Sequence, residues 1–434
     1  MHWSHFLILS TTLSSAACAQ SLPSSAHLAA LDAAVSVAPA DPAEPATPLT
    51  IEQALELAEK NNPLLTESAA IRARAQAAVR TSKAYTNPTV EFLGGDQSAR
   101  AVSNPGVPGA FTHYGAGQTI EVPSERRARI HAAQLELTGA GHQFESVRLA
   151  VAARVRRAFY DVLRRKQQLA NAHDNLALVE DLRRRVGMEV QVGEKGKLEL
   201  TRAEAELARA RAVVRGADAQ LANARAMLKA VLGASADSNY DPQGKPAEGR
   251  TLPPLADLRA QVLEHHPALA EAASRTTQAE TLVERERARR IPEPTFQGFY
   301  ERQPDVTLWQ VGVSVPLPLW DRRKGPIGEA QAESRRWNAV TQQRKLELTA
   351  ALESAYDQYE ISDQQVQGLE AGSLREAQAA VDAARSAYRF GERGILEVLD
   401  AQRVLQGVRS DLLDALYARQ TALIDLEELG AMQP

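Results

Sequence analysis

The sequence predicts a mainly α-helical fold with a small β portion, and three observations lead to this prediction. The segment QVGEKGKLEL at 191–200 returns as RFGERGILEV at 389–398, which indicates a duplicated domain. Each copy of this ten-residue segment comes directly after a stretch with a helical pattern, and that stretch is too long for a helix of an ordinary globular domain. Before each pattern lie two short segments in which apolar and polar residues alternate, as they do in strands. We therefore expect two repeats, each with a strand pair and a hairpin of long helices.

The N-terminus has the features of an export signal. An apolar run begins at Phe6 and leads into an A-x-A cleavage pattern around Cys18. Residues 1–19 are therefore expected to be a signal peptide, and lipidation of Cys18 is the alternative interpretation. Residues 20–48 are rich in alanine, serine and proline and are predicted to form an extended tether.

The duplication sets the domain boundaries. LTIEQALELAEKNNPLL, which starts at Leu49, is matched by LADLRAQVLEHHPAL, which starts at Leu255. In each half, short helices should precede a strand pair and a helical hairpin. Repeat 1 is placed at 49–250, with strands within 88–122 and a hairpin at 124–232; repeat 2 is placed at 251–430, with strands within 294–316 and a hairpin at 322–430. Residues 124–186 contain no proline and would extend roughly 95 Å as one helix.

The helix after each turn predicts how the hairpins pack. From Leu200 to Val231, apolar residues follow the 3-4 spacing of a coiled-coil seam. The same spacing recurs from Val398 to Leu429 with one exception, Arg419. Alanine occupies alternate seam positions and aromatic residues make up only 5% of the chain, so slender helices should lie close together as rods.

The predicted strands are long enough to cross a membrane when tilted. Trp309, Val311 and Val313 alternate with polar or small residues, which gives one apolar and one polar face. Four strands cannot close a barrel, because about eight is the minimum. Three chains would supply twelve. The alternative is a pair of solvent-exposed hairpins that cap a helical bundle.

Composition and motifs exclude several function classes. The net charge is −4 and no nucleic-acid-binding motif is present, so nucleic acid is not an expected partner. The sequence has no glycine-rich phosphate loop, no G-x-S-x-G and no H-E-x-x-H motif. The pair His265-His266 replaces Asn61-Asn62 of repeat 1, so a helix break before proline explains it better than a metal site. No enzyme activity, cofactor or resident metal is expected.

Four segments together form a specific signature. They are IEQALELAEKNNPLL at 51–65, VRRAFYDVL at 155–163, VGVSVPLPLWDRRKGPIGEAQAE at 311–333 and YRFGERGILEVLDAQRVL at 388–405. The chain resembles the TolC-like outer-membrane efflux channels over essentially all of 49–430, and within them the outer-membrane components of heavy-metal tripartite pumps. The resemblance implies a homotrimer in the outer membrane of a Gram-negative bacterium, with a 12-stranded β-barrel and a periplasmic α-helical tunnel. It also implies three further partners: a periplasmic adaptor protein, an inner-membrane RND pump and outer-membrane lipid.

On this resemblance, the repeated turns would surround the periplasmic entrance and contact the adaptor. The matching residues are Val192 and Gly193 in the first turn and Phe390 and Gly391 in the second. Glycine suits the left-handed backbone of a helix end. The family's arginine before this turn is replaced by Glu189 and Ala387, a departure that leaves the identity of the adaptor open. Plain turns without a partner are the alternative.

Charged residues beside the second turn correspond to a gate in similar channels. Glu397 and Asp400 would line the entrance as an acidic ring that favours cations. Tyr388 and Arg393 would bond to Glu199 and hold the entrance closed. Solvated helix faces and weak surface ion pairs are the alternatives.

Three functions remain open from the sequence. The leading interpretation is a passive exit duct for heavy-metal cations. The second is the same duct in drug or type I protein export, because pump specificity resides largely outside this subunit. The third is a periplasmic coiled-coil scaffold without a pore, which would be soluble and electrically silent.

Overall fold

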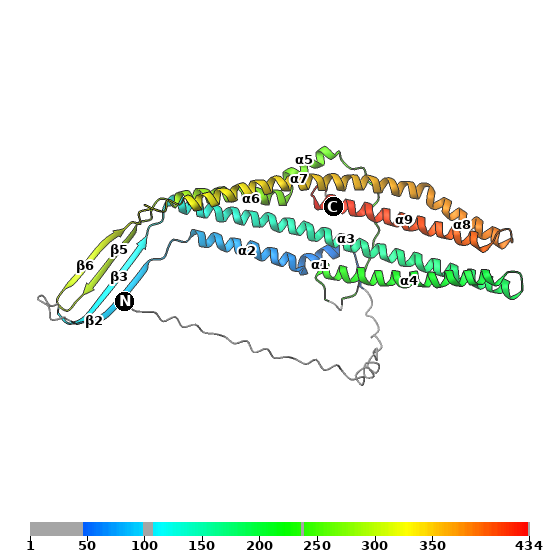
Figure 1. Cartoon of the computed structure of the whole chain (residues 1–434), viewed down its shortest axis with the longest axis horizontal. Coiled ribbons are helices and arrows are strands. Elements are labelled where there is room, and N and C mark those ends of the chain that lie inside the picture. The colour runs from blue at the N-terminus through cyan, green and yellow to red at the C-terminus, as the bar shows by residue number, and fades with distance from the viewer. Residues whose placement is uncertain (1–46, 99–106, 236–237, 433–434) are drawn as a thin grey trace, which may run out of the picture. The chain divides into compact units, whose positions relative to one another are not determined.

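The computed structural model describes residues 47–98, 107–235 and 238–432. The predicted signal peptide, Cys18 and most of the predicted tether lie outside these residues. The described chain confirms the mainly α-helical class with a small β portion (Figure 1). No helix in these ranges is both long enough and apolar enough to cross a membrane.

The helices and strands follow the same order in both halves of the chain. The first half contains β1 (Thr47–Leu49), α1 (Ile51–Asn61), α2 (Pro63–Lys83), β2 (Thr89–Gln97), β3 (Gly109–Thr119), α3 (Pro123–Gln191) and α4 (Lys197–Leu232). The second half contains β4 (Tyr240–Pro242), α5 (Leu255–His265), α6 (Pro267–Ala288), β5 (Thr295–Arg302), β6 (Thr307–Ser314), α7 (Lys324–Gly368), the π-helix η1 (Leu369–Ser373), α8 (Leu374–Arg389) and α9 (Ile395–Glu428). α3 packs against α2, α4 and α6, and α7 packs against α6 and α9.

The short helices of each half are separated by one capping residue. The Asn62 side-chain oxygen accepts a hydrogen bond from the Leu64 N–H at 2.9 Å, and His266 Nδ1 accepts one from the Ala268 N–H at 3.1 Å. A proline follows each cap, at a position where a helix does not use its N–H. His266 therefore has the capping role that its match to Asn62 predicts.

Each half has its own apolar core, where the first short helix crosses the hairpin. In the first half, Ala58 of α1 belongs to a buried cluster with Phe159 of α3 and Leu228 of α4. In the second half, Val262 of α5 belongs to a buried cluster with Leu352 of α7. Burial of one large apolar side chain stabilises the fold by roughly 1.5–3 kcal/mol. The short helices therefore hold the long helices together.

The predicted coiled-coil seam is buried or partly buried at every position in both α4 and α9. Arg419, the exception in the pattern, is only 7% exposed. Its Nη1 donates to Asp363 Oδ1 of α7 at 2.8 Å, and its Nη2 donates to the Ala247 carbonyl at 2.9 Å. The neighbouring Gln420 side-chain oxygen accepts from the Ala247 N–H at 2.7 Å. The charge in the seam thus anchors the segment that connects the two repeats.

The second long helix differs from the first. α3 continues for 69 residues, whereas its counterpart is interrupted between α7 and α8 by the five-residue π-helix η1. Gly368 and Gly372 accompany this interruption. π-turns inside α-helices arise where the hydrogen-bond ladder gains a residue. The first long helix is therefore continuous, as the absence of proline predicts, and its counterpart in the second repeat is not.

Four strands form one antiparallel sheet in the order β2-β3-β5-β6 (Figure 1). On one face, an aromatic row crosses all four strands and consists of Phe92, Tyr114, Tyr300 and Trp309. The opposite face carries His113 and Glu301, whose Nδ1 and Oε2 atoms lie 3.3 Å apart. Among the described strands, the outer edges of β2 and β6 have no partner.

A smaller parallel sheet joins β1 to β4. Thr47 and Pro48, which the sequence analysis places at the end of the tether, belong to β1. The Thr47 N–H donates to the Asn239 carbonyl at 2.8 Å. This pairing brings the start of repeat 1 beside the start of the connection to repeat 2.

Candidate functional site: the hairpin turns and the sheet

The two hairpin turns share one backbone geometry. Gly193 has a φ of 83° and Gly391 a φ of 75°, both in the left-handed region. In the first turn the Gly193 N–H donates to the Val190 carbonyl at 3.2 Å, and the Glu194 N–H donates to the Glu189 carbonyl at 2.9 Å. The second turn repeats both bonds at 3.1 and 3.0 Å. These are the two bonds of a Schellman motif, so the repeated sequence encodes a repeated turn.

The tips of the turns expose apolar side chains. Val192 is 72% exposed, Phe390 is 80% exposed and Leu198 is 63% exposed. Nothing lies within 4 Å of a Cβ atom placed on Gly193 or Gly391. Because grouped apolar exposure is characteristic of contact surfaces, the tips have the chemistry expected of residues that meet a partner.

Tyr388 joins the two hairpins of the chain. Its ring is buried in an apolar cluster with Val186 of α3 and Val398 of α9, and its hydroxyl donates to Glu189 Oε2 at 2.5 Å. The Lys195 amino group lies 5.6 Å from the centre of the ring. Burial, followed by the bond to Glu189, raises the pKa of Tyr388 above its ordinary value. The hydroxyl therefore remains a protonated donor.

The other two residues of the predicted latch are not joined to Tyr388 by a hydrogen bond within the described chain. Arg393 Nη1 lies 4.0 Å from Glu397 Oε1, one turn along its own hairpin. The Glu199 carboxylate still acts on Tyr388, because its charge contributes to the raised pKa. Glu199 Oε2 is buried and has no hydrogen-bond partner in the part of the chain described. A buried acceptor of this kind is costly when it stays unpaired.

The residues of the predicted acidic ring lie at the start of α9. The Glu397 and Asp400 side chains are 46% and 67% exposed. Arg403 Nη1 lies 3.0 Å from Asp400 Oδ1, and its Nη2 lies 3.2 Å from Glu206 Oε2 on α4. Arg403 therefore partly neutralises the Asp400 charge and makes a second contact between the hairpins. The sequence analysis did not identify Arg403, Glu206 or the role of Glu189.

A cavity of about 670 Å³, lined by both polar and apolar side chains, lies between α3, α4 and α9. Gln402 is 6% exposed and donates from Nε2 to Asn175 Oδ1 at 3.0 Å, while its Oε1 has no partner among the described residues. Gly216 and Gly407 also line the cavity. The two hairpins are thus joined by a few polar contacts here and by the apolar cluster around Tyr388 nearer the turns.

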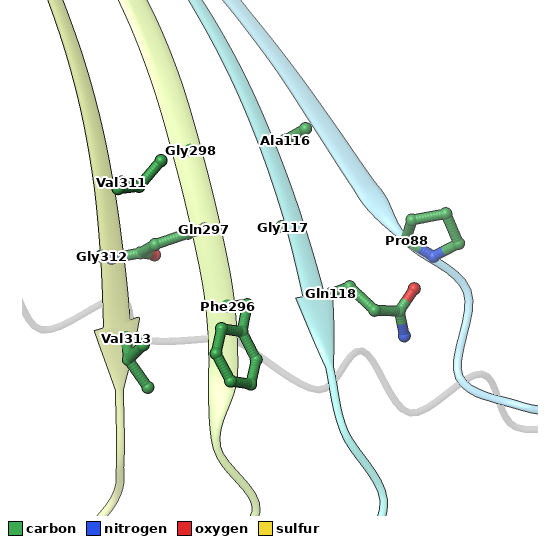
Figure 2. Close-up of a pocket in the computed structure, with 10 residues that line it drawn as sticks. All are labelled: Pro88, Ala116, Gly117, Gln118, Phe296, Gln297, Gly298, Val311, Gly312 and Val313. Atoms are coloured by element: carbon green, nitrogen blue, oxygen red, sulfur yellow. The ribbon is translucent and has the colours of Figure 1, made fainter.

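The apolar face of the sheet has a hollow of about 640 Å³ (Figure 2). In the strand register, Gly298 lies between Ala116 and Val311, so the middle of this row has almost no side chain. Figure 2 shows Phe296 and Val311 on the strands that border it. The described residues contain no group of three His, Cys, Asp or Glu side chains that could hold a metal ion.

Comparison with known proteins identifies the family. The sequence profile described as "Outer membrane efflux protein" matches residues 54–234 and 258–430, one segment in each half of the chain. The chain belongs to the outer membrane efflux protein family. This membership confirms the family, the outer-membrane localisation and the efflux function expected from the sequence.

Individual relatives agree with this assignment. This efflux protein is 28% identical to the cobalt-zinc-cadmium resistance protein CzcC of Cupriavidus metallidurans over 92% of its own length and 94% of that protein. It is 25% identical to the nickel-cobalt-cadmium resistance protein NccC of Alcaligenes xylosoxydans xylosoxydans, over 72% and 70% of the two lengths. Its fold matches a crystal structure of CusC with a TM-score of 0.76 and 19% identity, over 87% of this chain and 91% of that chain.

Proposed function

We propose that three copies of this efflux protein form an outer-membrane exit duct for heavy-metal cations. The duct would receive its substrate from an inner-membrane RND pump and a periplasmic adaptor and would conduct it passively. The family membership over both halves carries this proposal. The metal substrate is supported by the names of two relatives, which are cobalt-zinc-cadmium and nickel-cobalt-cadmium resistance proteins.

The sheet supports closure by several chains. It has one apolar face crossed by aromatic side chains, and the outer edges of β2 and β6 are unpaired among the described residues. Four strands are too few for a closed barrel, so pairing of β2 with β6 of the next copy would remove both open edges. Three copies then give twelve strands, with the face of His113 and Glu301 toward the lumen.

The hairpin turns would form the periplasmic entrance. Val192, Gly193, Phe390 and Gly391 would contact the adaptor, since the turns expose apolar surface. Within one chain, the Tyr388–Glu189 bond holds the two hairpins together. We assign the remaining latch contact to neighbouring copies, because, among the described residues, Glu199 Oε2 is buried without a donor and Arg393 has a partner only at 4.0 Å.

Glu397 and Asp400 would give the entrance its preference for cations. Both carboxylates are at least partly exposed at the start of α9, directly after the second turn. A constriction lined by three copies of each would concentrate negative potential, which raises the local concentration of cations.

Conductance measurements on the purified protein test this function. We expect a trimeric mass in detergent and single-channel currents in planar bilayers, with a reversal potential that shows cation preference. Glu397→Gln with Asp400→Asn should reduce that preference, and Glu199→Ala or Arg393→Ala should raise the conductance. Unchanged conductance in both latch variants would remove the latch from the proposal.

The alternative functions predict different results. A soluble protein without channel activity would be the coiled-coil scaffold. A deletion strain that became sensitive to drugs but kept its resistance to cobalt, zinc and cadmium would identify a drug duct. We expect the reverse pattern of sensitivity.

A further inference from the structure

The loop between β6 and α7 exposes several large apolar side chains. Trp320 is 93% exposed, Leu317 is 67% exposed and Leu319 is 60% exposed. The loop follows β6, where Val311 and Val313 are 78% and 56% exposed on the apolar face of the sheet. The apolar face therefore continues beyond the end of the strand, toward the helices.

Cations follow this apolar segment directly. Arg322 and Lys324 are exposed, and neither has an acidic partner among the described residues. The residue between them, Arg323, is instead fixed: its guanidinium donates to Glu286 Oε2 at 2.6 and 3.2 Å, and its N–H donates to Asp321 Oδ1 at 2.7 Å.

The fixed residue also has an unusual backbone. Arg323 has a φ of 57°, which makes it the one non-glycine residue with positive φ in the described ranges. An L-residue in this region costs roughly 1–2 kcal/mol, and the ion pair to Glu286 and the bond to Asp321 offset that cost. The loop is consequently a defined turn that keeps Trp320 and Arg322 in solvent.

The first repeat provides an internal comparison. There two of the three arginines after the strand pair are held by neighbouring groups: Arg129 Nη2 lies 2.8 Å from Glu121 Oε2, and Arg126 stacks on the Tyr85 ring at 4.2 Å, while Arg127 is exposed. Arg126 Nε is also 3.7 Å from Glu121. Equivalent places in the duplication therefore differ in degree: one exposed cation, Arg127, remains in the first half, whereas Arg322 and Lys324 stand beside exposed apolar side chains in the second.

We propose that residues 315–324 form a docking surface for anionic phospholipid. Leu317, Leu319 and Trp320 would enter the boundary between headgroups and acyl chains, and Arg322 and Lys324 would bind the phosphate. The inference rests on the proposed membrane position of the sheet. Along this loop, apolar residues come first, a tryptophan follows, and cations come last. This is the order in which these residue types occur across a membrane interface. A neighbouring copy of the chain would not require unpaired cations at this place.

Lipid selectivity at Trp320 tests the proposal. The full chain is reconstituted with Trp309→Phe and Trp337→Phe, so that Trp320 reports alone after removal of the signal peptide. Quenching by brominated phosphatidylglycerol and brominated phosphatidylcholine then gives the relative binding of the two lipids at this loop. We expect preference for phosphatidylglycerol at low salt, about fivefold for each of the two cations.

Charge variants sharpen the test, and Arg322→Gln alone, which should lower the preference about fivefold, matches the control Arg127→Gln in charge change. Arg322→Gln with Lys324→Gln should abolish the preference, whereas Arg127→Gln, an exposed arginine after the first strand pair, should leave it unchanged. Equal quenching by both lipids in the parent protein would overturn the proposal. So would the absence of quenching by either lipid in a protein that conducts, since a second copy would then cover the loop. Loss of conductance in the parent would instead contradict the proposed duct.

Discussion

Removal of the Tyr388 hydroxyl is expected to loosen the two hairpins without damaging their packing. Tyr388→Phe keeps the ring in its apolar cluster and removes the donor to Glu189. Glu189→Gln keeps the side-chain size and removes the charge. Each substitution therefore weakens one defined bond between α3 and α8.

The size of the effect follows from the bond. A hydrogen bond to a charged group contributes about 1.5–3 kcal/mol net, or a factor of roughly 10 to 150 in an equilibrium constant. Tyr388 is 7% exposed and its hydroxyl lies 2.5 Å from the carboxylate, so solvent screens the bond little. If the hairpins must separate for the entrance to open, the open population should rise by a factor in this range for each chain.

Single-channel recording of a double-mutant cycle measures this rise in the open population. Tyr388→Phe and Glu189→Gln should each raise the open probability, and the double variant should add little to either, since both remove the same bond. The pKa of Tyr388 is raised, so its contribution is complete below the ordinary pKa near 10 and is lost only above that value. Closure of the parent should thus persist to pH 10. Full additivity, or unchanged gating in all three variants, would refute the reasoning.

Substitutions at three further sites test the helical portion. Burial lowers the pKa of His266, so the folded state favours the neutral imidazole, and the free energy of unfolding should fall as the pH drops below about 6.5. His266→Asn, which copies the Asn62 cap, should weaken this pH dependence. Thermal melts monitored by circular dichroism measure it. Arg419→Leu should cost about 3–5 kcal/mol by leaving the Asp363 carboxylate without its cation, with only the Gln367 amide donating to it, and adding Asp363→Leu should recover much of that loss; an unrecovered melting temperature would contradict this prediction. Gly391→Ala should cost about 1–2 kcal/mol from its positive φ alone, because the added methyl has open space, and a loss well above this range would indicate a hidden contact.

The helices, turns and strands could be predicted because the residue pattern of each lies within one continuous stretch of sequence. The seams of α4 and α9 follow from residue spacing, and the turns follow from glycines whose left-handed backbone a Schellman motif requires. The strands follow from alternation, and the exception Arg419 was visible as a break in the pattern.

The partners of these residues could not be predicted in the same way. Glu189 and Tyr388 lie 199 positions apart, and only the packing of the two hairpins around Tyr388 brings them together. The anchoring of Arg419 similarly depends on a segment 172 positions away. The three-residue strands β1 and β4 are too short to show a period, and no periodicity marks the π-helix η1.

The open edges of the sheet have a consequence for biogenesis. β2 is synthesised early, yet in the proposed assembly its partner is β6 of another molecule, which appears only after most of the chain has been made. Unpaired strand edges can pair with any strand nearby, so a newly exported subunit is prone to aggregate until it assembles with other copies of the chain. The cell must therefore protect this protein during its passage to the membrane, and overproduction should fill the periplasm with misassembled material before it fills the membrane with channels.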